Sequence, residues 1–386
     1  MRVLPSSGSV YIAVTVCACL LLAACGNAEQ RDKLIEEKWL ASPHADAEAW
    51  AFSHWNVDED NDRECATCHA AAAAAHEDEL EGMTFDQLAC ADCHDDEEIP
   101  SECARCHSTS GYFDFLGLDG AAAGGVDRAA PRGNVLECES CHNDATREKN
   151  SSSMPSGIEI AGLGVEASCM DCHQGRHSKI SVDDALTGLD DDEVDTELRL
   201  IDIHSGAAGP SQYGTQAKGG YEYDGRTYSG AYTHVVMFET CIDCHDAHST
   251  EIKGEECVAC HVGATTAEGR AEIRVSGTDF DGDGNVNEGL SEEISDIRER
   301  LLLVIKVYAA KTKGLEKIAY EDRRPYFFDE QGEPYATWTP RLLRAAYNYR
   351  YTAAPGGFAH GGKYHIELLY DSLNDLGTDT SVITRP

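Results

Sequence analysis

One short motif, Cys-x-x-Cys-His, occurs seven times between residues 65 and 261 of the chain. The two thiols of such a motif can form thioether bonds with one haem, and the adjacent imidazole can bind the haem iron. A single copy would also fit half of a zinc site, but seven copies that all end in histidine favour haem. We therefore predict seven haem c groups. The expected thioether residues are Cys65, Cys68, Cys90, Cys93, Cys103, Cys106, Cys138, Cys141, Cys169, Cys172, Cys241, Cys244, Cys257 and Cys260. The expected proximal iron ligands are His69, His94, His107, His142, His173, His245 and His261.

A second set of histidines can bind the opposite side of each iron. Low-spin haem iron needs a sixth ligand, usually His or Met. The chain has 16 His and only 5 Met, so nine histidines remain for seven positions once the motifs are counted. Bis-histidine ligation gives a lower reduction potential than His/Met ligation, which suits anaerobic respiration. The expected distal ligands are His44, His54, His76, His204, His234, His248 and His360. The two histidines left out are His177 and His365, and His177 is the natural substitute for His76.

The positions of these histidines along the chain support several of the assignments. His248 follows its own motif by three residues, too close to reach across that haem, so it is expected to serve a neighbouring one. His204 and His234 lie in residues 174–240, which contain no motif and are expected to return toward haems bound elsewhere. His360 lies between two Gly-Gly pairs, which would let the backbone approach a porphyrin closely.

An acidic stretch follows the last motif. Residues 279–287, Asp-Phe-Asp-Gly-Asp-Gly-Asn-Val-Asn, match the first nine positions of an EF-hand calcium loop, and Gly284 allows its sharp turn. Position twelve is Leu290 and not glutamate, so a closing carboxylate would come from Glu288, Glu292 or Glu293. The alternative is an acidic turn before a helix. We predict one bound Ca²⁺ with the ligands Asp279, Asp281, Asp283 and Asn285.

The cysteines outside the motifs indicate export. Of the 17 cysteines, fourteen are in the motifs, and Cys17, Cys19 and Cys25 lie near the N-terminus. An apolar run over residues 10–22 is too short to span a bilayer, and Leu-Ala-Ala-Cys-Gly ends it. This pattern resembles a bacterial lipoprotein signal, with lipid on Cys25; the alternative is an ordinary secretory signal. We expect an exported protein that is lipid-anchored in the cell envelope, at the outer membrane.

The net charge of the chain is −38 at pH 7 with neutral histidines. Such a charge argues against nucleic acid as a partner, because phosphates would be repelled. It suits docking to a basic redox protein or to an extracellular mineral or metal surface that accepts electrons. Solubility alone would explain the charge equally well.

The elements that carry these residues differ along the chain. Residues 60–270 are rich in Gly, Asp, Ser and Ala with little periodicity, so loops and short helices are expected around the haems. Apolar residues at three- and four-residue steps predict a helix over residues 290–308. Helices are also expected from Thr339–Pro340 and over residues 366–376. The expected fold is mainly α with extensive loops and little β, cored by haems, with a C-terminal helical bundle. The expected parts are a signal peptide (1–25), a seven-haem region (26–270) and a calcium-like loop with helices packed on the haems (271–386).

Several stretches outside the motif repeats carry a further likeness. They are Ser42–Asp46, Ser53–Trp55, Cys169–Arg176, Ile203–His204, Cys241–His248, Trp338–Tyr349 and Ala359–His360. They resemble stretches of multihaem c-type cytochromes of the outer-envelope or extracellular electron-transfer type, from anaerobically respiring bacteria. The resemblance implies electron transfer, with distal ligands at the histidines of these stretches. This chain has His177 after Gln-Gly-Arg where such proteins carry an acidic residue, and His76 lies in what resembles an added haem module.

Two functions remain open at this point. The first is an electron carrier without catalytic residues. The second is a multihaem reductase, akin to enzymes acting on nitrite, hydroxylamine or tetrathionate, which needs a haem with an open site, often marked by a CxxCK motif. The chain has no CxxCK, and its histidines suffice for every haem, so the carrier is favoured. Self-association into a cytochrome polymer is a third possibility.

Overall fold

The computed structural model describes residues 30–49, 98–99, 101–131, 135–204, 206–274, 276–312, 314–322 and 325–386. Five of the seven motifs fall within these ranges. Several expected site residues lie outside them: Cys25, His54, Cys65, Cys68, His69, His76, Cys90, Cys93 and His94.

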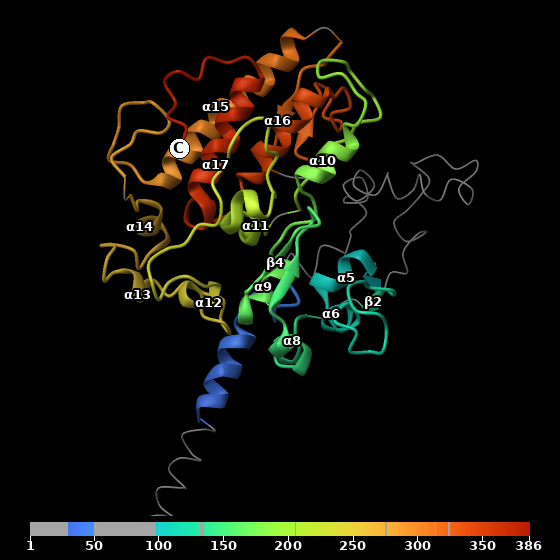
Figure 1. Ribbon diagram of the computed structural model, residues 1–386, viewed down its shortest axis with the longest axis vertical. Helices are drawn as coiled ribbons and strands as arrows, with labels where there is room; N and C mark the ends of the chain where they lie inside the picture. The colour runs from blue at the N-terminus through green and yellow to red at the C-terminus, as the bar shows by residue number, and fades with distance from the viewer. Residues whose placement is uncertain are drawn as a thin grey trace, which may run out of the picture.

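Short helices joined by loops make up the motif-bearing part of the chain, which fills the lower half of Figure 1. A helix over residues 30–40 extends below it. The other helices before residue 290 are α5 (Ser101–His107), α6 (Thr109–Phe115), α7 (Cys138–Cys141), α8 (Asp144–Glu148), η2 (Gly164–Glu166), α9 (Ala167–Cys172), α10 (Lys179–Ala185), α11 (Ala208–Tyr213), η3 (Gly214–Gln216), α12 (Cys241–Cys244), α13 (Gly254–Cys257) and α14 (Ala267–Ala271).

The strands of the described residues form three two-stranded antiparallel sheets. They pair β1 (Glu98–Ile99) with β2 (Ala130–Pro131), β3 (Ser151–Ser153) with β4 (Glu159–Ala161), and β5 (Ala319–Tyr320) with β6 (Phe327–Phe328). Each strand has only two or three residues. The expectation of a mainly α chain with extensive loops and little β is therefore confirmed.

Three longer helices form the C-terminal part: α15 (Leu290–Lys311), α16 (Pro340–Tyr351) and α17 (Gly357–Asp375). α16 begins where the sequence predicts, since the Thr339 hydroxyl accepts the Leu342 N–H at 3.2 Å and Pro340 follows the cap. α17 begins nine residues before the predicted 366, with a non-helical Gly361 inside it. A Cβ at Gly361 would lie 2.0 Å from the Ser211 carbonyl oxygen, so this glycine lets α11 approach α17.

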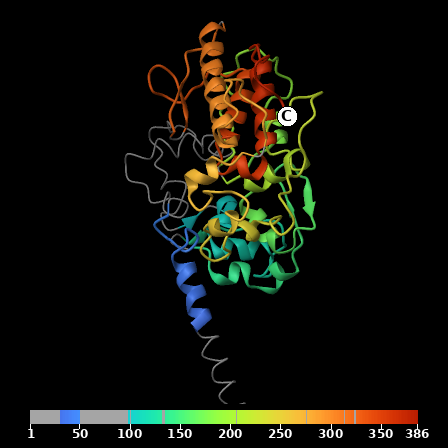
Figure 2. The ribbon, with the colours of Figure 1, turned by 90° about the vertical axis from the view of Figure 1, so that its left-hand side faces the viewer.

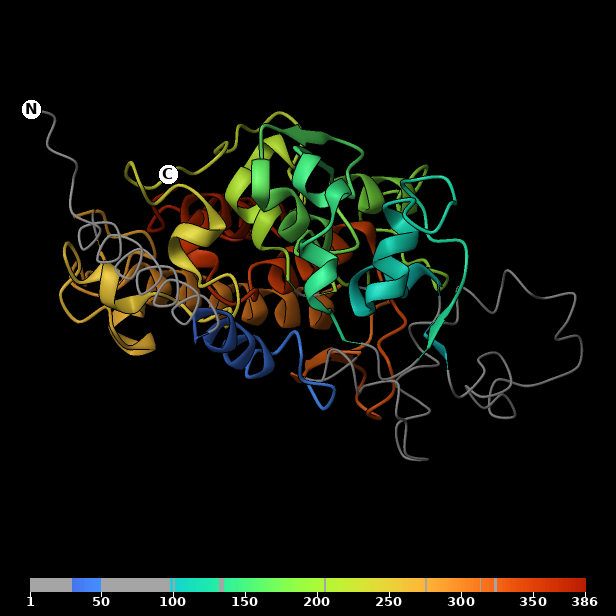
Figure 3. The ribbon, with the colours of Figure 1, turned by 90° about the horizontal axis from the view of Figure 1, so that it is seen from below.

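The main hydrophobic core lies among these three helices. Leu301, Ile305 and Leu342 have no exposed surface, and Trp338 and Tyr347 are equally buried beside them. Two smaller clusters lie in the motif-bearing part, one around Met154 and Ile160 and the other around Ile99. Figure 2 shows the C-terminal helices above the motif-bearing part, and Figure 3 shows the same two layers from below.

The longest helices of the described residues are α15, with 22 residues, and α17, with 19. Within the described ranges, no helix is both long enough and apolar enough to cross a membrane.

Candidate haem sites and an acidic loop

Each motif histidine in the described residues lies beside one histidine from outside the motifs. The ring centroids are 6.0 Å apart for His44 and His173, 5.9 Å for His107 and His204, 6.1 Å for His142 and His248, 6.0 Å for His234 and His261, and 6.5 Å for His245 and His360. Two imidazoles on opposite sides of one metal atom, each bound at about 2 Å, have centroids roughly 6 Å apart. The five pairs therefore fit one iron between each two rings. The donor set, two imidazoles beside two thiols, is that of a bis-histidine haem c.

The two histidines left out of the expected ligand set have other surroundings. His365 is fully buried, and its Nε2 lies 2.9 Å from the Ser211 hydroxyl oxygen. Burial, with His360 and Arg298 nearby, lowers the pKa of His365 to about 3, so its imidazole is neutral. His177 is partly buried, and burial lowers its pKa too, ahead of the charge of Arg176. Among the described residues, neither ring stacks on a motif histidine.

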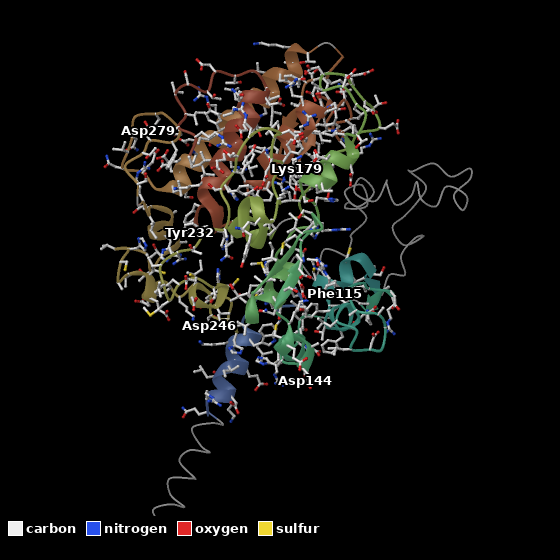
Figure 4. All side chains as sticks on the ribbon, viewed as in Figure 1. Phe115, Asp144, Lys179, Tyr232, Asp246 and Asp279 are labelled. Atoms are coloured by element: carbon white, nitrogen blue, oxygen red, sulfur yellow. The ribbon has the colours of Figure 1, made fainter. Side chains whose placement is uncertain are left out.

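The motif of α7 receives its expected distal ligand from the loop that follows another motif. Asp246 forms a turn there, since its Oδ1 accepts the backbone N–H groups of His248 and Ser249 at 3.0 Å each. Its Oδ2 accepts a hydrogen bond from Lys38 at 2.6 Å, which ties the loop to the helix over residues 30–40 (Figure 4). Lys38 is also the first cause of the strongly lowered pKa of Asp246. A fixed negative charge thus anchors the turn that carries His248.

The ring of His245 is oriented by its own loop. Its Nδ1 lies 3.1 Å from the Thr250 carbonyl oxygen, so this nitrogen donates a proton there and Nε2 is left for a metal. The loop folds back on α12, because the Lys253 N–H donates to the Cys244 carbonyl oxygen at 2.8 Å. Thr250 has a φ of 61°, in the left-handed region that branched residues rarely adopt. The loop thus holds the imidazole as metal-binding histidines are commonly held.

His204 also sits on strained backbone, with a φ of 59°. Its neighbour Ile203 is fixed because the carbonyl oxygen of that residue accepts the Arg176 N–H at 2.9 Å. Gly175 makes this approach possible, since a Cβ there would lie 2.9 Å from the same oxygen. Such strain persists only where the surrounding structure enforces it, and it is common at functional sites.

Burial keeps several of these imidazoles neutral. It is the first cause of the lowered pKa of His44 and His360, each to about 4, and of the lowered pKa of His173. Neighbouring imidazoles are the next cause: His173 for His44, and His245 for the other two. A neutral imidazole has a free lone pair, which is the form that binds iron.

The acidic loop, in which Figure 4 labels Asp279, lies between α14 and α15 and brings several carboxylates together. Ligand atoms of Asp279, Asp281 and Glu293 lie within 4.8 Å of one another, and so do those of Asp281, Asp283 and Glu288. Burial, aided by the neighbouring carboxylates, raises the pKa of Asp281 to about 7 and raises that of Glu288. A cation would relieve this crowding.

The acidic residues after the loop have distinct roles. Glu293 is fully buried and forms an ion pair with Arg274, and its Oε2 accepts the N–H groups of Phe280 and Asp281. Glu288 has one carboxylate oxygen, Oε1, that is buried with no hydrogen-bond partner in the described structure. The amide of Asn285 donates to the other oxygen of Glu288 at 2.8 Å. The loop therefore places Glu288 beside Asp281 and Asp283, a role for which the sequence offered three candidates.

One buried carboxylate inside a motif was not singled out from the sequence. Asp171, inside the α9 motif, is buried to 1% exposure and accepts hydrogen bonds from Tyr112 at 2.9 Å and from Ser152 at 2.7 Å. Its ion pair with Lys149 is 3.2 Å long. An Asp in the same place of the α12 motif, Asp243, is half-exposed, so the motif sequence alone does not reveal which carboxylate is buried.

Comparison with known proteins gives distant relatives of one kind. The chain is 24% identical over 350 residues to the C-type polyheme cytochrome OmcB of two Geobacter sulfurreducens strains, DL-1 / KN400 and ATCC 51573 / DSM 12127 / PCA. It is 24% identical over 363 residues to OmcC, another C-type polyheme cytochrome of the second strain. Each alignment covers 72% of this chain but only 44% of OmcB and 43% of OmcC, so the chain spans less than half the length of these relatives.

The other two comparisons add no further relative. No family model matches the chain. No solved structure matches it either. The distant homology to polyheme cytochromes nevertheless agrees with the motifs and the ring pairs, and together they support a multihaem c-type cytochrome with haem c cofactors.

Proposed function

We propose that this chain transfers electrons through seven covalently bound haems, each with two histidine ligands, in the cell envelope during anaerobic respiration. The haems would supply one-electron chemistry, and the protein would fix their positions and axial ligands. The single observation that carries the proposal is the set of five histidine pairs, because each pair joins one motif histidine to one histidine from elsewhere in the chain.

The proposal assigns the distal ligands in full. His44 serves the motif of α9, His204 that of α5, His248 that of α7, His360 that of α12, and His234 that of α13, on the ring separations given above. His54 and His76 remain the proposed ligands for the first two motifs, with His177 the substitute for His76. With both axial positions filled by protein, no haem offers an open site, which is why a carrier is favoured over a reductase.

A redox titration followed by absorption and electron paramagnetic resonance (EPR) tests this function on the purified protein. Seven haems per chain, all low-spin, with low midpoint potentials are expected. A high-spin haem in the native protein would contradict the proposal and favour the reductase.

The proposed setting is a lipid-anchored position at the outer membrane, with lipid on Cys25. The proposed electron partners are basic redox proteins or an extracellular mineral, since a chain of charge −38 attracts positive surfaces and repels nucleic acid. Mass spectrometry of membrane-extracted protein should find an acylated Cys25 at the N-terminus. An unmodified N-terminus beyond Cys25 would contradict the anchor.

A Ca²⁺ ion is proposed for the acidic loop, bound by Asp279, Asp281 and Asp283, with Asn285 as the fourth expected ligand. Support comes from Glu288, whose buried Oε1 lacks a hydrogen-bond partner within the described structure and lies on the same cluster. Binding to the folded state alone would stabilise it by mass action. Chelation with EGTA should therefore lower the thermal midpoint of calcium-containing protein, and Asp283→Asn should reduce that response. An unchanged midpoint would contradict the site.

A further inference from the structure

Two motif helices, α5 and α9, meet through their second cysteines. The Cys106 thiol lies 3.8 Å from the Asp171 carbonyl oxygen, and the Cys172 thiol lies 4.0 Å from the Arg105 carbonyl oxygen. The two helices also pack directly against each other. Since each of these thiols is an attachment point for one haem, two haems must be attached within a few atoms of each other.

The other end of α9 meets two further motifs. Glu166, the residue before α9, accepts the Cys241 N–H at the start of α12. Leu136, which precedes α7, donates its N–H to the His44 carbonyl oxygen at 3.1 Å, and His44 pairs with His173 of the α9 motif. The α9 site thus lies beside the motifs of α7 and α12.

The motif of α13 has a different position. The Cys257 thiol lies 3.6 Å from the Lys253 carbonyl oxygen, and the Lys253 N–H donates to the Cys244 carbonyl oxygen of α12 at 2.8 Å. The loop between the two motifs is tied to α12 through Lys253, whose ammonium group donates to the Ile242 carbonyl oxygen at 2.7 Å. Figure 1 shows the resulting arrangement, with α9 between α5 and α12 and α13 beyond α12.

The segments that carry distal histidines cross between the same motifs. Ile203 accepts the Arg176 N–H and Gly209 donates to the His173 carbonyl oxygen at 3.0 Å, so residues 203–209 pack on the α9 motif. The same segment carries His204, which pairs with the α5 motif. A shift of α9 would therefore disturb a ligand of its neighbour, and the two sites form one unit.

We infer that the α9 motif is the junction of the haem array, where the motifs of α5, α7 and α12 meet, and that electrons crossing between α5 and α13 pass through its haem. Each transfer moves one electron, so one iron goes from ferrous to ferric as its neighbour goes from ferric to ferrous. The inference rests on the proposed electron-transfer function. It means that the order of motifs in the sequence is not the order of the route.

Diffraction at the iron absorption edge, on crystals of the haem-loaded native protein, tests the junction directly. The iron bound by His173 should have the irons bound by His107, His142 and His245 as neighbours, and the iron bound by His261 should be near that of His245 alone among these. An iron at His173 that lies at one end of the array would overturn the junction while leaving the proposed function intact. Loss of bis-histidine ligation in the same crystals would instead overturn the proposed function.

A solution experiment uses the buried carboxylate of the junction. Asp171 lies between the α5 and α9 sites, and a buried negative charge favours ferric over ferrous iron. Asp171→Asn should therefore move the titration of two haems to higher potential. A shift of one haem or of none would count against the contact between these sites.

The matched control is Asp243→Asn, at the same motif position in α12. Asp243 is half-exposed and caps its own helix by accepting from the Thr240 hydroxyl at 2.7 Å, so water screens its charge. This variant should move the titration less than Asp171→Asn. Equal shifts of the haem potentials in the two variants would show that Asp171 has no special effect on the α5 and α9 sites. If either variant fails to attach its haems, the diffraction experiment decides whether the α9 motif is the junction.

Discussion

The C-terminal helices and the motif helices of this chain are held in place by different means. α15 has 22 residues and buries Ile297, Leu301 and Ile305 against α16 and α17, as an amphipathic helix does in an ordinary globular domain. α7, α12 and α13 have four residues each, far too few to be stable as isolated helices. The proposed haems, attached to these short helices, would fix their positions in place of a large side-chain core.

α17 belongs to both parts of the molecule, because one of its histidines faces a motif and another lies in the C-terminal core. His360, before the break at Gly361, faces the α12 motif, while His365 is buried in the helical core against Ser211. The same helix thus carries one histidine that faces a proposed haem site and another that packs in the hydrophobic core. This contrast allows the contribution of haem attachment and that of side-chain packing to be tested separately.

The largest expected effect follows from producing the chain without haem attachment. Amide protection measured by hydrogen exchange should then disappear from α5, α7, α9, α12 and α13, because their small clusters cannot offset the lost chain entropy. Protection in α15 and α16 should persist. Equal loss in both parts would show that the C-terminal helices depend on haem as well, and the comparison would fail.

The next effect compares the main core with a small cluster, by substituting one residue in each in the haem-loaded protein. Leu301→Ala should lower the free energy of unfolding by about 2–5 kcal/mol, since it opens a cavity in the main core. Ile160→Ala, in the small cluster around Met154, should cost less, because few neighbours remain to lose contact. Chemical denaturation followed by circular dichroism measures both. A larger loss of unfolding free energy for Ile160→Ala than for Leu301→Ala would contradict the view that the main core lies among the C-terminal helices.

A smaller effect concerns pH and belongs to the helical core. The pKa of His365 is about 3 when folded and 6.5 in its ordinary range, so between these values only the unfolded chain binds the proton. Stability should therefore fall as the pH drops from 6.5 toward 3, by at most about 1.4 kcal/mol per unit, and should not depend on His365 above 6.5. His365→Gln should remove this part of the slope in pH-dependent unfolding. An unchanged slope would contradict a buried neutral imidazole.

The sequence predicted those features that depend on neighbouring residues. The helix from Leu290 and the cap at Thr339–Pro340 follow from periodicity and capping within a few residues, and both are confirmed. The start of α17 was predicted too late, because the fit of Gly361 against α11 is a contact between distant segments.

Prediction of the candidate sites from the sequence is limited in the same way, by contacts between distant segments. The motifs predict the haem attachment points, and counting histidines leaves nine candidates for seven distal positions. Which distal histidine faces which motif depends on long-range packing, as for His44 and His173, and no local pattern encodes it. The grouping of Glu288 with Asp281 and Asp283 likewise emerged only from the folded loop.

The most direct test of bis-histidine ligation compares two variants on α17 by EPR and absorption spectroscopy. His360→Ala should convert one of seven haems from low-spin to high-spin, because it removes the imidazole opposite His245. His365→Ala should leave all haems low-spin and only lower stability, by about 1–3 kcal/mol, since it leaves the buried Ser211 hydroxyl without its histidine partner. A high-spin haem in the His365 variant but not in the His360 variant, or in the unaltered protein, would contradict the account.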